Sequence, residues 1–281
     1  MIHNQRIIYS DNGVNADKSV VLNDYRGQTF VPGHTTGQDY LYIAGDLPFN
    51  HRYFLIPIVN DVATVVTVQI WYGNTWVDAV DVIDLTLGVA GKSMSQSGII
   101  EWKPNRLKGW DRQEDSEDVI GVTKVGIYNM YWARLAWASG SLKSTMALQY
   151  IGFKFSSDDD LGDYYPDLIN TNLRSAFEAG KTTWNEQHFA AAESIVRYLR
   201  NKRVLYSPNQ ILNPELFQVA AIHKTAALIY TGLGKTYSDH KAAAEKEYIA
   251  EINMQFPDVD LTQDGNLDDV ERRNSTRFFS R

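Results

Sequence analysis

The chain has 281 residues, of which 44% are hydrophobic and 12% aromatic, a composition that supports packed cores and argues against disorder. Its net charge is −7 and neither half is basic, which disfavours nucleic-acid binding driven by overall charge. It contains no cysteine, so disulfides, thiolate metal sites and cysteine nucleophiles are excluded.

Residues 1–6 lack the apolar core of a signal peptide, and no apolar run reaches the length of a membrane span. We therefore expect a soluble protein that is made in the cytoplasm and has no membrane partner.

The first part of the chain, residues 1–157, has the pattern of antiparallel strands. Residues 64–71 alternate, with Val66, Val68 and Ile70 on one face, and Gly73-Asn74 then predicts a tight hairpin to residues 76–80. Further short strands are expected at 40–43, 53–58, 98–102, 122–128, 131–137 and 148–155, with 106–118 as a loop and 1–18 as a flexible end. Many short strands between turns predict a β-sandwich, jelly-roll-like in type.

Six tryptophans lie in this part: Trp71, Trp76, Trp102, Trp110, Trp132 and Trp137. Packing in a core or between subunits is their favoured role, because strands bury aromatic residues. The alternative is that exposed rings stack on sugars. Three carboxylates, Asp81, Asp84 and Glu101, could be imagined as the pair of a glycoside hydrolase, but no pattern fixes their separation. We therefore expect no enzyme and no catalytic residues.

The composition changes at residues 158–166. The acidic segment 158–165 is expected to be a linker or helix entry, and residues 166–256 are expected to form a four-helix bundle. Its helices are expected at 166–179, at 184–203 after a capping box that begins at Thr183, from Asn213 to Gly232, and from Ser238 or Asp239 to a stop at Pro257. The predicted fold class is α+β with two domains and a C-terminal tail, 257–281.

The last two predicted helices carry a family resemblance. The third is Ala-rich (residues 219–230, VAAIHKTAALIY), a short glycine-containing turn follows, and the fourth is charged (residues 243–252, AAEKEYIAEI). In this order and spacing the bundle resembles the head–tail connector (adaptor, or neck) proteins of tailed bacteriophages. The β part would then be an addition that decorates or reinforces a neck or capsid.

The resemblance implies a structural protein of the virion, assembled in the host cytoplasm. It implies a homo-oligomer, a dodecameric ring docked between the portal protein and the tail, tail-terminator or neck proteins. Double-stranded DNA would pass through its centre without sequence-specific contact. The runner-up hypothesis is a carbohydrate-binding or decoration protein of a phage capsid or tail.

An acidic segment near the C-terminus matches a calcium-binding loop. Its candidate ligands are Asp260, Thr262, Asp264, Asn266 and Glu271, with Gly265 at the turn. Such spacing lets one turn converge several oxygens on Ca²⁺. Thr262 departs from the usual Asp or Asn and the loop has no partner loop, so a solvated acidic tail is the alternative.

Two further motifs concern phosphate. Residues 231–236 (TGLGKT) imitate the end of a phosphate-binding loop, but Ile229 replaces the first glycine and a helix precedes, so an inter-helix turn is predicted. Arg197, Arg200 and Arg203 are spaced by three on the second predicted helix. They could face DNA in a channel or a neighbouring subunit, and a solvated helix face is the alternative. The six histidines show no metal-binding spacing.

Overall fold

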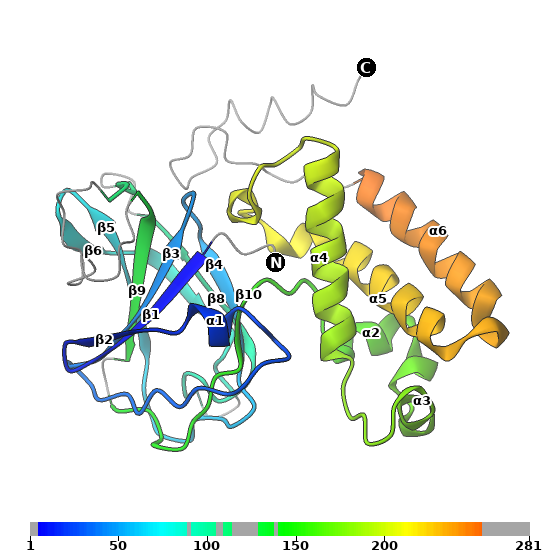
Figure 1. Cartoon of the computed structure of the whole chain (residues 1–281), viewed down its shortest axis with the longest axis horizontal. Helices are drawn as coiled ribbons and strands as arrows, with labels where there is room; N and C mark the ends of the chain where they lie inside the picture. The colour runs from blue at the N-terminus through cyan, green and yellow to red at the C-terminus, as the bar shows by residue number, and fades with distance from the viewer. Residues whose placement is uncertain (1–4, 89–90, 105–108, 114–128, 138–139, 255–281) are drawn as a thin grey trace. The chain divides into compact units, whose positions relative to one another are not determined.

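A computed structural model describes residues 5–88, 91–104, 109–113, 129–137 and 140–254 (Figure 1). Within them the chain forms two compact units. The β unit contains the chain up to Gly152 together with a later segment, Ser207–Leu212. The helical unit contains Phe153–Tyr206 and, among the later described residues, Asn213–Met254. The protein is therefore α+β, with antiparallel sheets first and helices after them, as the sequence predicts.

The β unit contains two antiparallel sheets that face each other as in a sandwich. The six-stranded sheet has the order β2 (Val14–Asp17), β1 (Gln5–Asp11), β3 (Tyr40–Gly45), β9 (Tyr131–Trp137), β5 (Val66–Tyr72) and β6 (Thr75–Asp78). The four-stranded sheet has the order β10 (Tyr150–Gly152), β4 (His51–Leu55), β8 (Gly98–Lys103) and β7 (Val80–Asp84). A short helix, α1 (Ser19–Leu22), follows β2.

The core of this unit follows from the alternation in its strands. Val66, Val68 and Ile70 of β5 are all buried, as predicted, while Thr67 between them is exposed. They join one cluster with residues of the other sheet, including Ile100 and Trp102. Gly73 and Asn74 connect β5 to β6 with positive φ angles of 55° and 61°, the conformation of a two-residue hairpin, which confirms that prediction.

Several strand predictions were wrong. Residues 5–17 were expected to be flexible, but β1 pairs with both β2 and β3 and buries Ile7 and Tyr9 in the core. The strand expected at 76–80 is two strands, β6 and β7, which belong to different sheets. The strand expected at 148–155 is reduced to β10. Residues 122–128 and most of the loop 106–118 lie outside the described residues.

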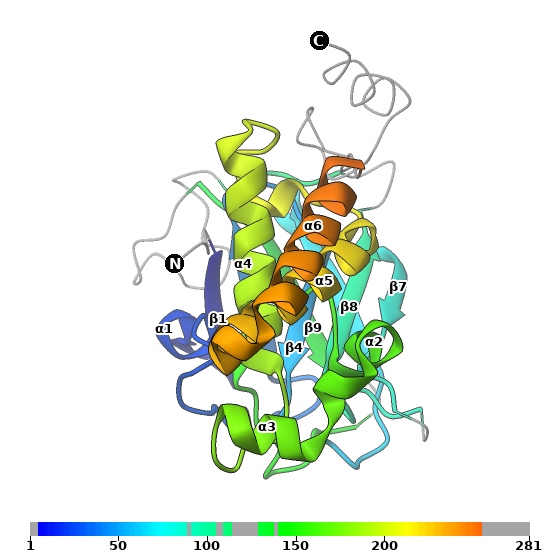
Figure 2. The ribbon, with the colours of Figure 1, turned by 90° about the vertical axis from the view of Figure 1, so that its right-hand side faces the viewer.

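Among its described residues, the helical unit contains five α-helices and three short 3-10 turns. In chain order these are α2 (Asp158–Tyr164), η2 (Pro166–Ile169), α3 (Thr171–Phe177), α4 (Asn185–Asn201), η4 (Pro214–Phe217), α5 (Gln218–Leu233), η5 (Lys235–Tyr237) and α6 (Ser238–Met254). The helix α5 packs against both α4 and α6 (Figure 2). The remaining turn, η3 (Pro208–Gln210), belongs to the β unit.

The acidic segment 158–165, which was expected to be a linker or helix entry, contains the helix α2 up to Tyr164. Ser157 caps α2 through a reciprocal pair of hydrogen bonds with Asp160. The three aspartates of the first turn also stabilise the helix, because their negative charges lie at the positive end of its dipole. The helix expected at 166–179 is broken into η2 and α3, because Asn170 has an extended backbone and caps α3. This break is a case in which a local cap competes with helix continuation.

The boundaries of α4 and α5 also differ from prediction. The capping box at Thr183 does not form: Trp184 is the N-cap residue, without a side-chain bond, and its backbone N–H donates to Asp158 (N···Oδ1 3.0 Å). Gly232 lies inside α5, which ends at Leu233, and Gly234 with φ 91° follows. The predicted inter-helix turn is therefore confirmed only from Gly234 onward, because residues 231–233 belong to α5.

Candidate functional site

The predicted arginine stripe is only partly a helix face. Arg197 is exposed on α4. Arg200 is half-buried and its Nε donates to the carbonyl of Tyr206 at 2.8 Å, which stabilises the turn after the helix. Arg203 lies beyond the helix end with a left-handed φ of 58°, so it does not continue the stripe. Of the three arginines, Arg197 retains the exposed position on a helix face that the hypothesis requires.

The predicted calcium ligands Asp260, Thr262, Asp264, Asn266 and Glu271 lie outside the described residues. Within the described residues, no group of three or more His, Cys, Asp or Glu side chains is arranged to hold a metal ion.

The three carboxylates considered for glycoside hydrolysis have other surroundings. Asp81 lies at an irregularity in β7 with φ 50° and pairs with Lys103 at 3.1 Å. Asp84 accepts bonds from the backbone N–H and hydroxyl of Thr86, which fixes the turn after β7. Glu101 lies opposite Ile83 in the ladder between β7 and β8. Asp81 and Asp84 thus stabilise local structure.

Five of the six tryptophans are buried: Trp71, Trp102, Trp110, Trp132 and Trp137. This placement confirms packing as their main role. Trp76 is the exception, because it is half-buried on the outer side of the six-stranded sheet.

Around Trp76 lies a group that sequence reasoning missed. We call it the aromatic–polar face; it consists of Tyr40, Gln69, Trp76, Asp78 and Arg134. The guanidinium of Arg134 lies 4.4 Å from the ring centroid of Tyr40 and 4.7 Å from that of Trp76. Its Nε donates to Gln69 at 2.6 Å, and Gln69 donates to Asp78 at 2.7 Å. The sequence signal that could have identified this face is the period-two spacing of polar and aromatic residues on β3, β5, β6 and β9.

The helical unit contains a Ser-His-Asp row. His188 Nδ1 lies 2.7 Å from Ser156 Oγ, and its Nε2 lies 3.2 Å from Asp158 Oδ1. These residue types do not make a catalytic site by themselves. Ser156 and His188 are 5% and 0% exposed, so a substrate has no access to them.

Asp158 in this row acts as a structural acceptor. Besides His188 it accepts bonds from the backbone of Trp184 and from Arg174, which joins the starts of α2 and α4. Burial alone would raise its pKa, but the bonds from His188, Trp184 and Arg174 outweigh this and hold the pKa of Asp158 below its usual value. The row is therefore a buried hydrogen-bond network that stabilises the unit.

One exposed apolar surface of the β unit lies along the edge strand of its smaller sheet. We call it the β7 edge: Val80, Val82 and Ile83 of β7 and Leu85 directly after it, which are 37, 36, 49 and 50% exposed. Among the described strands, β7 ends this sheet, and only β8 pairs with it. An exposed apolar edge strand presents unpaired backbone groups and invites pairing with another chain.

The comparisons with known proteins give no identity: no family model matches the sequence, and no curated protein matches it. In the described part of the chain, no helix is both long and apolar enough to cross a membrane.

Proposed function

We propose that the protein is a structural component of a tailed-phage virion, a head–tail adaptor that forms a ring between portal and tail. In this proposal the helical unit is a connector-type bundle and the β unit is an addition that contributes to the contacts between copies. The protein then needs no catalytic residues, and DNA passes through the ring during ejection. The sequence resemblance of α5 and α6 motivates the proposal.

The structural observation that supports it is the β7 edge. Exposed apolar side chains on and beside an edge strand are a liability for a protein that works alone, because they promote uncontrolled association. They are useful in a protein whose copies cover one another. In a ring each copy uses two different surfaces, so the β7 edge of one copy packs against another surface of its neighbour.

The experiment is a comparison of oligomeric states by size-exclusion chromatography with light scattering. Ile83→Lys places a charge on the β7 edge and is expected to reduce a ring to single chains while circular dichroism and melting temperature stay unchanged. Val20→Lys is the matched control, because Val20 is 89% exposed on α1 outside the edge. A wild-type chain that stays monomeric both alone and with its portal would contradict the proposal.

We also infer that the sandwich is jelly-roll-like. The pairing of its strands supports this topology. The strands β3 and β9 pair with each other, and the strands β4 and β8, which lie between them in the sequence, also pair with each other. Successive pairs of this kind lie in opposite sheets, as in a folded-over ribbon of strands.

A second function is supported by the aromatic–polar face. Half-buried Tyr40 and Trp76 beside the planar groups of Arg134 and Gln69 form the kind of surface on which sugar rings stack and hydrogen-bond. A carbohydrate-binding role on a capsid or tail would use this face. Titration with bacterial cell-wall polysaccharide tests it: Trp76→Ala is expected to abolish binding, and equal binding by that variant would remove this alternative.

A further inference from the structure

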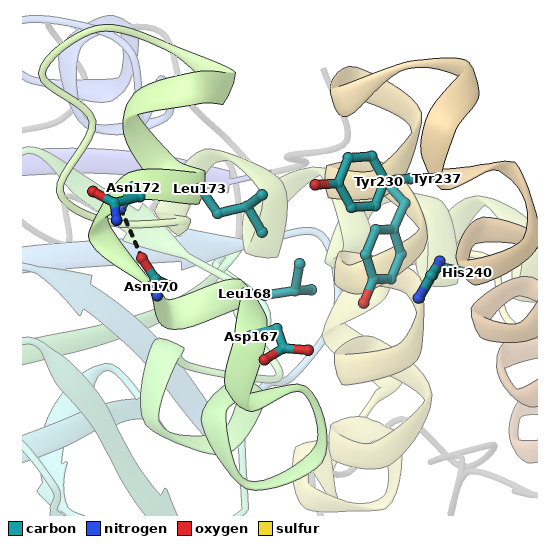
Figure 3. Close-up of a pocket in the computed structure, with 8 residues that line it drawn as sticks. All are labelled: Asp167, Leu168, Asn170, Asn172, Leu173, Tyr230, Tyr237 and His240. Carbon is teal, nitrogen blue, oxygen red and sulfur yellow. Dashed lines mark hydrogen bonds between the residues drawn. The ribbon is translucent and has the colours of Figure 1, made fainter.

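A cavity of about 400 Å³ in the helical unit has two unlike walls (Figure 3). One wall consists of residues from η2 and the start of α3, and the other consists of aromatic residues from α5, η5 and α6. The lining residues are Asp167, Leu168, Asn170, Asn172, Leu173, Tyr230, Tyr237 and His240.

The aromatic wall is a continuous surface. The rings of Tyr230 and Tyr237 are stacked, with centroids 5.9 Å apart and planes 19° from parallel. His240 packs against both, at 5.4 and 5.9 Å. Such ring faces carry negative electrostatic potential and attract cations.

The opposite wall supplies a negative charge. Asp167 is exposed, and its carboxylate has no hydrogen bond or ion pair with the described residues. Figure 3 shows its carboxylate on the face of this wall that is turned toward the tyrosine rings. Burial is the main cause that raises the pKa of Tyr230, and the charge of Asp167 adds to it, which indicates that the two groups are within electrostatic reach. No basic side chain of the described residues lines the cavity apart from the imidazole of His240.

The hydroxyl of Tyr230 is a further polar group of the aromatic wall. It makes no hydrogen bond with the described residues, and it is not among the buried polar atoms that lack a partner, so it is accessible to water or to a group bound in the cavity.

From these observations we propose that the cavity binds the guanidinium group of an arginine side chain that a partner protein presents. The carboxylate of Asp167 matches the paired N–H donors of a guanidinium, and the ring faces of Tyr230 and Tyr237 suit its flat, weakly hydrated cation. Leu173, which is partly exposed, suits the apolar stem of the side chain. Lysine fits less well, because its compact ammonium is more strongly hydrated and cannot stack. This inference holds whether or not the chain forms a ring.

The test is an NMR titration of the full chain with N-acetyl-arginine-amide, with N-acetyl-lysine-amide in parallel. The arginine probe is expected to bind saturably and more tightly than the lysine probe. Asp167→Asn is expected to weaken binding about tenfold or more, since it removes the charge-assisted bonds. Asp163→Asn is the matched control: Asp163 is an exposed acid on α2 that does not line the cavity.

A second pair of variants tests the aromatic wall. Tyr237→Leu is expected to weaken binding of the arginine probe, whereas Tyr237→Phe keeps the ring face and most of the affinity. Tyr206→Leu, at a tyrosine that is 81% exposed elsewhere, is expected to have no effect.

Several outcomes would overturn the proposal. They are the absence of saturable binding, equal affinity for the lysine probe, and equal losses in Asp167→Asn and Asp163→Asn. A peptide with a central arginine is expected to bind at least as tightly as the capped residue. Tighter binding of free L-arginine than of the peptide would instead assign the cavity to a small molecule.

Discussion

Arg52 lies at the centre of a buried hydrogen-bond network in the β unit. It is 0% exposed, and its guanidinium donates to Gln5 (2.9 Å), to the carbonyl of His51 (2.7 Å) and to Asn209 (2.6 Å). Asn209 and Ser207 in turn donate to Asp46, each at 2.7 Å. These bonds hold Ser207–Leu212, a segment from the helical part of the sequence, in the β unit.

Replacing Arg52 with methionine should therefore destabilise the β unit strongly. The side chain of similar length fills the space but removes the donor to Gln5 and to Asn209 and the positive charge near Asp46, a loss of about 3–5 kcal/mol in the free energy of unfolding. Urea unfolding followed by circular dichroism measures it. Arg197→Met on the exposed face of α4 is the control, and a loss at Arg52 no larger than the control's would show that the network contributes little.

Two buried histidines predict that stability decreases in acid. Burial lowers the pKa of His51 to about 3, with the charge of Arg52 as a further cause, and burial also lowers the pKa of His188. Both are neutral in the folded chain and take up a proton on unfolding below about pH 6.5. Stability is therefore complete above that pH and falls below it, by about 1.4 kcal/mol per pH unit for His51, and the lowered pKa of His188 adds a loss in the same direction.

Urea midpoints at pH 7.5 and 5.5 check this expectation. His188→Gln should make the decrease in stability between these two pH values smaller, even though it also lowers the stability at pH 7.5 through lost hydrogen bonds. A free energy of unfolding that stays constant over this interval in the wild-type chain would contradict it.

At the scale of the element, the β5–β6 hairpin offers a stabilising change. Both turn residues, Gly73 and Asn74, have positive φ, and the favoured order at such a turn is Asn-Gly rather than Gly-Asn. The swap Gly73→Asn with Asn74→Gly should raise the free energy of unfolding by about 0.5–1 kcal/mol. Thermal unfolding measures the gain. A lower melting temperature in the swapped variant would show that the turn does not have the hairpin conformation described.

The helix α5 depends on a glycine inside it. A Cβ at Gly232 would collide with the ring of Phe177 from α3. Gly232→Ala should cost about 1–3 kcal/mol, although alanine is the better helix former, because overpacking outweighs propensity. Adding Phe177→Leu should restore part of the loss. An alanine variant as stable as wild type would mean that α3 does not pack closely there.

Elements with strong periodicity could be predicted from the sequence. The alternation in β5 and the turn Gly73-Asn74 are local signals, and the structure has both. The break between η2 and α3 could not be predicted as readily, because Asn170 both fits a helix and caps one. The start of α4 depends on Asp158, which is distant in sequence from Trp184, so no local motif contains that information.

At the scale of the whole molecule, the candidate sites also combine residues that the sequence could indicate with residues that only the fold brings together. Trp76 was part of the sequence hypothesis for sugar binding, but Arg134 and Gln69 come from other strands and meet it only through the order of the sheet. Likewise, Asp167 and Tyr230 are far apart in sequence, and only the packing of the helices brings them to one cavity. Composition predicts that aromatic residues pack, whereas the fold decides which of them reach the surface.

The central proposal concerns the assembly of many copies through the β7 edge and the helical unit. If it is correct, the exposed side chains Val82 and Ile83 are buried in the assembled particle although they are exposed in the single chain. Hydrogen–deuterium exchange of β7 should therefore slow on assembly, while α1 should exchange equally in both states. Equal exchange of β7 in both states would remove the edge from the interface.

The most direct measurement is negative-stain electron microscopy of the purified chain mixed with the portal protein of its own virus. The account predicts closed rings with an open centre, stacked on the portal, that disappear in the Ile83→Lys variant and persist in Val20→Lys. Single chains beside bare portals in the wild-type sample would contradict the proposed adaptor function.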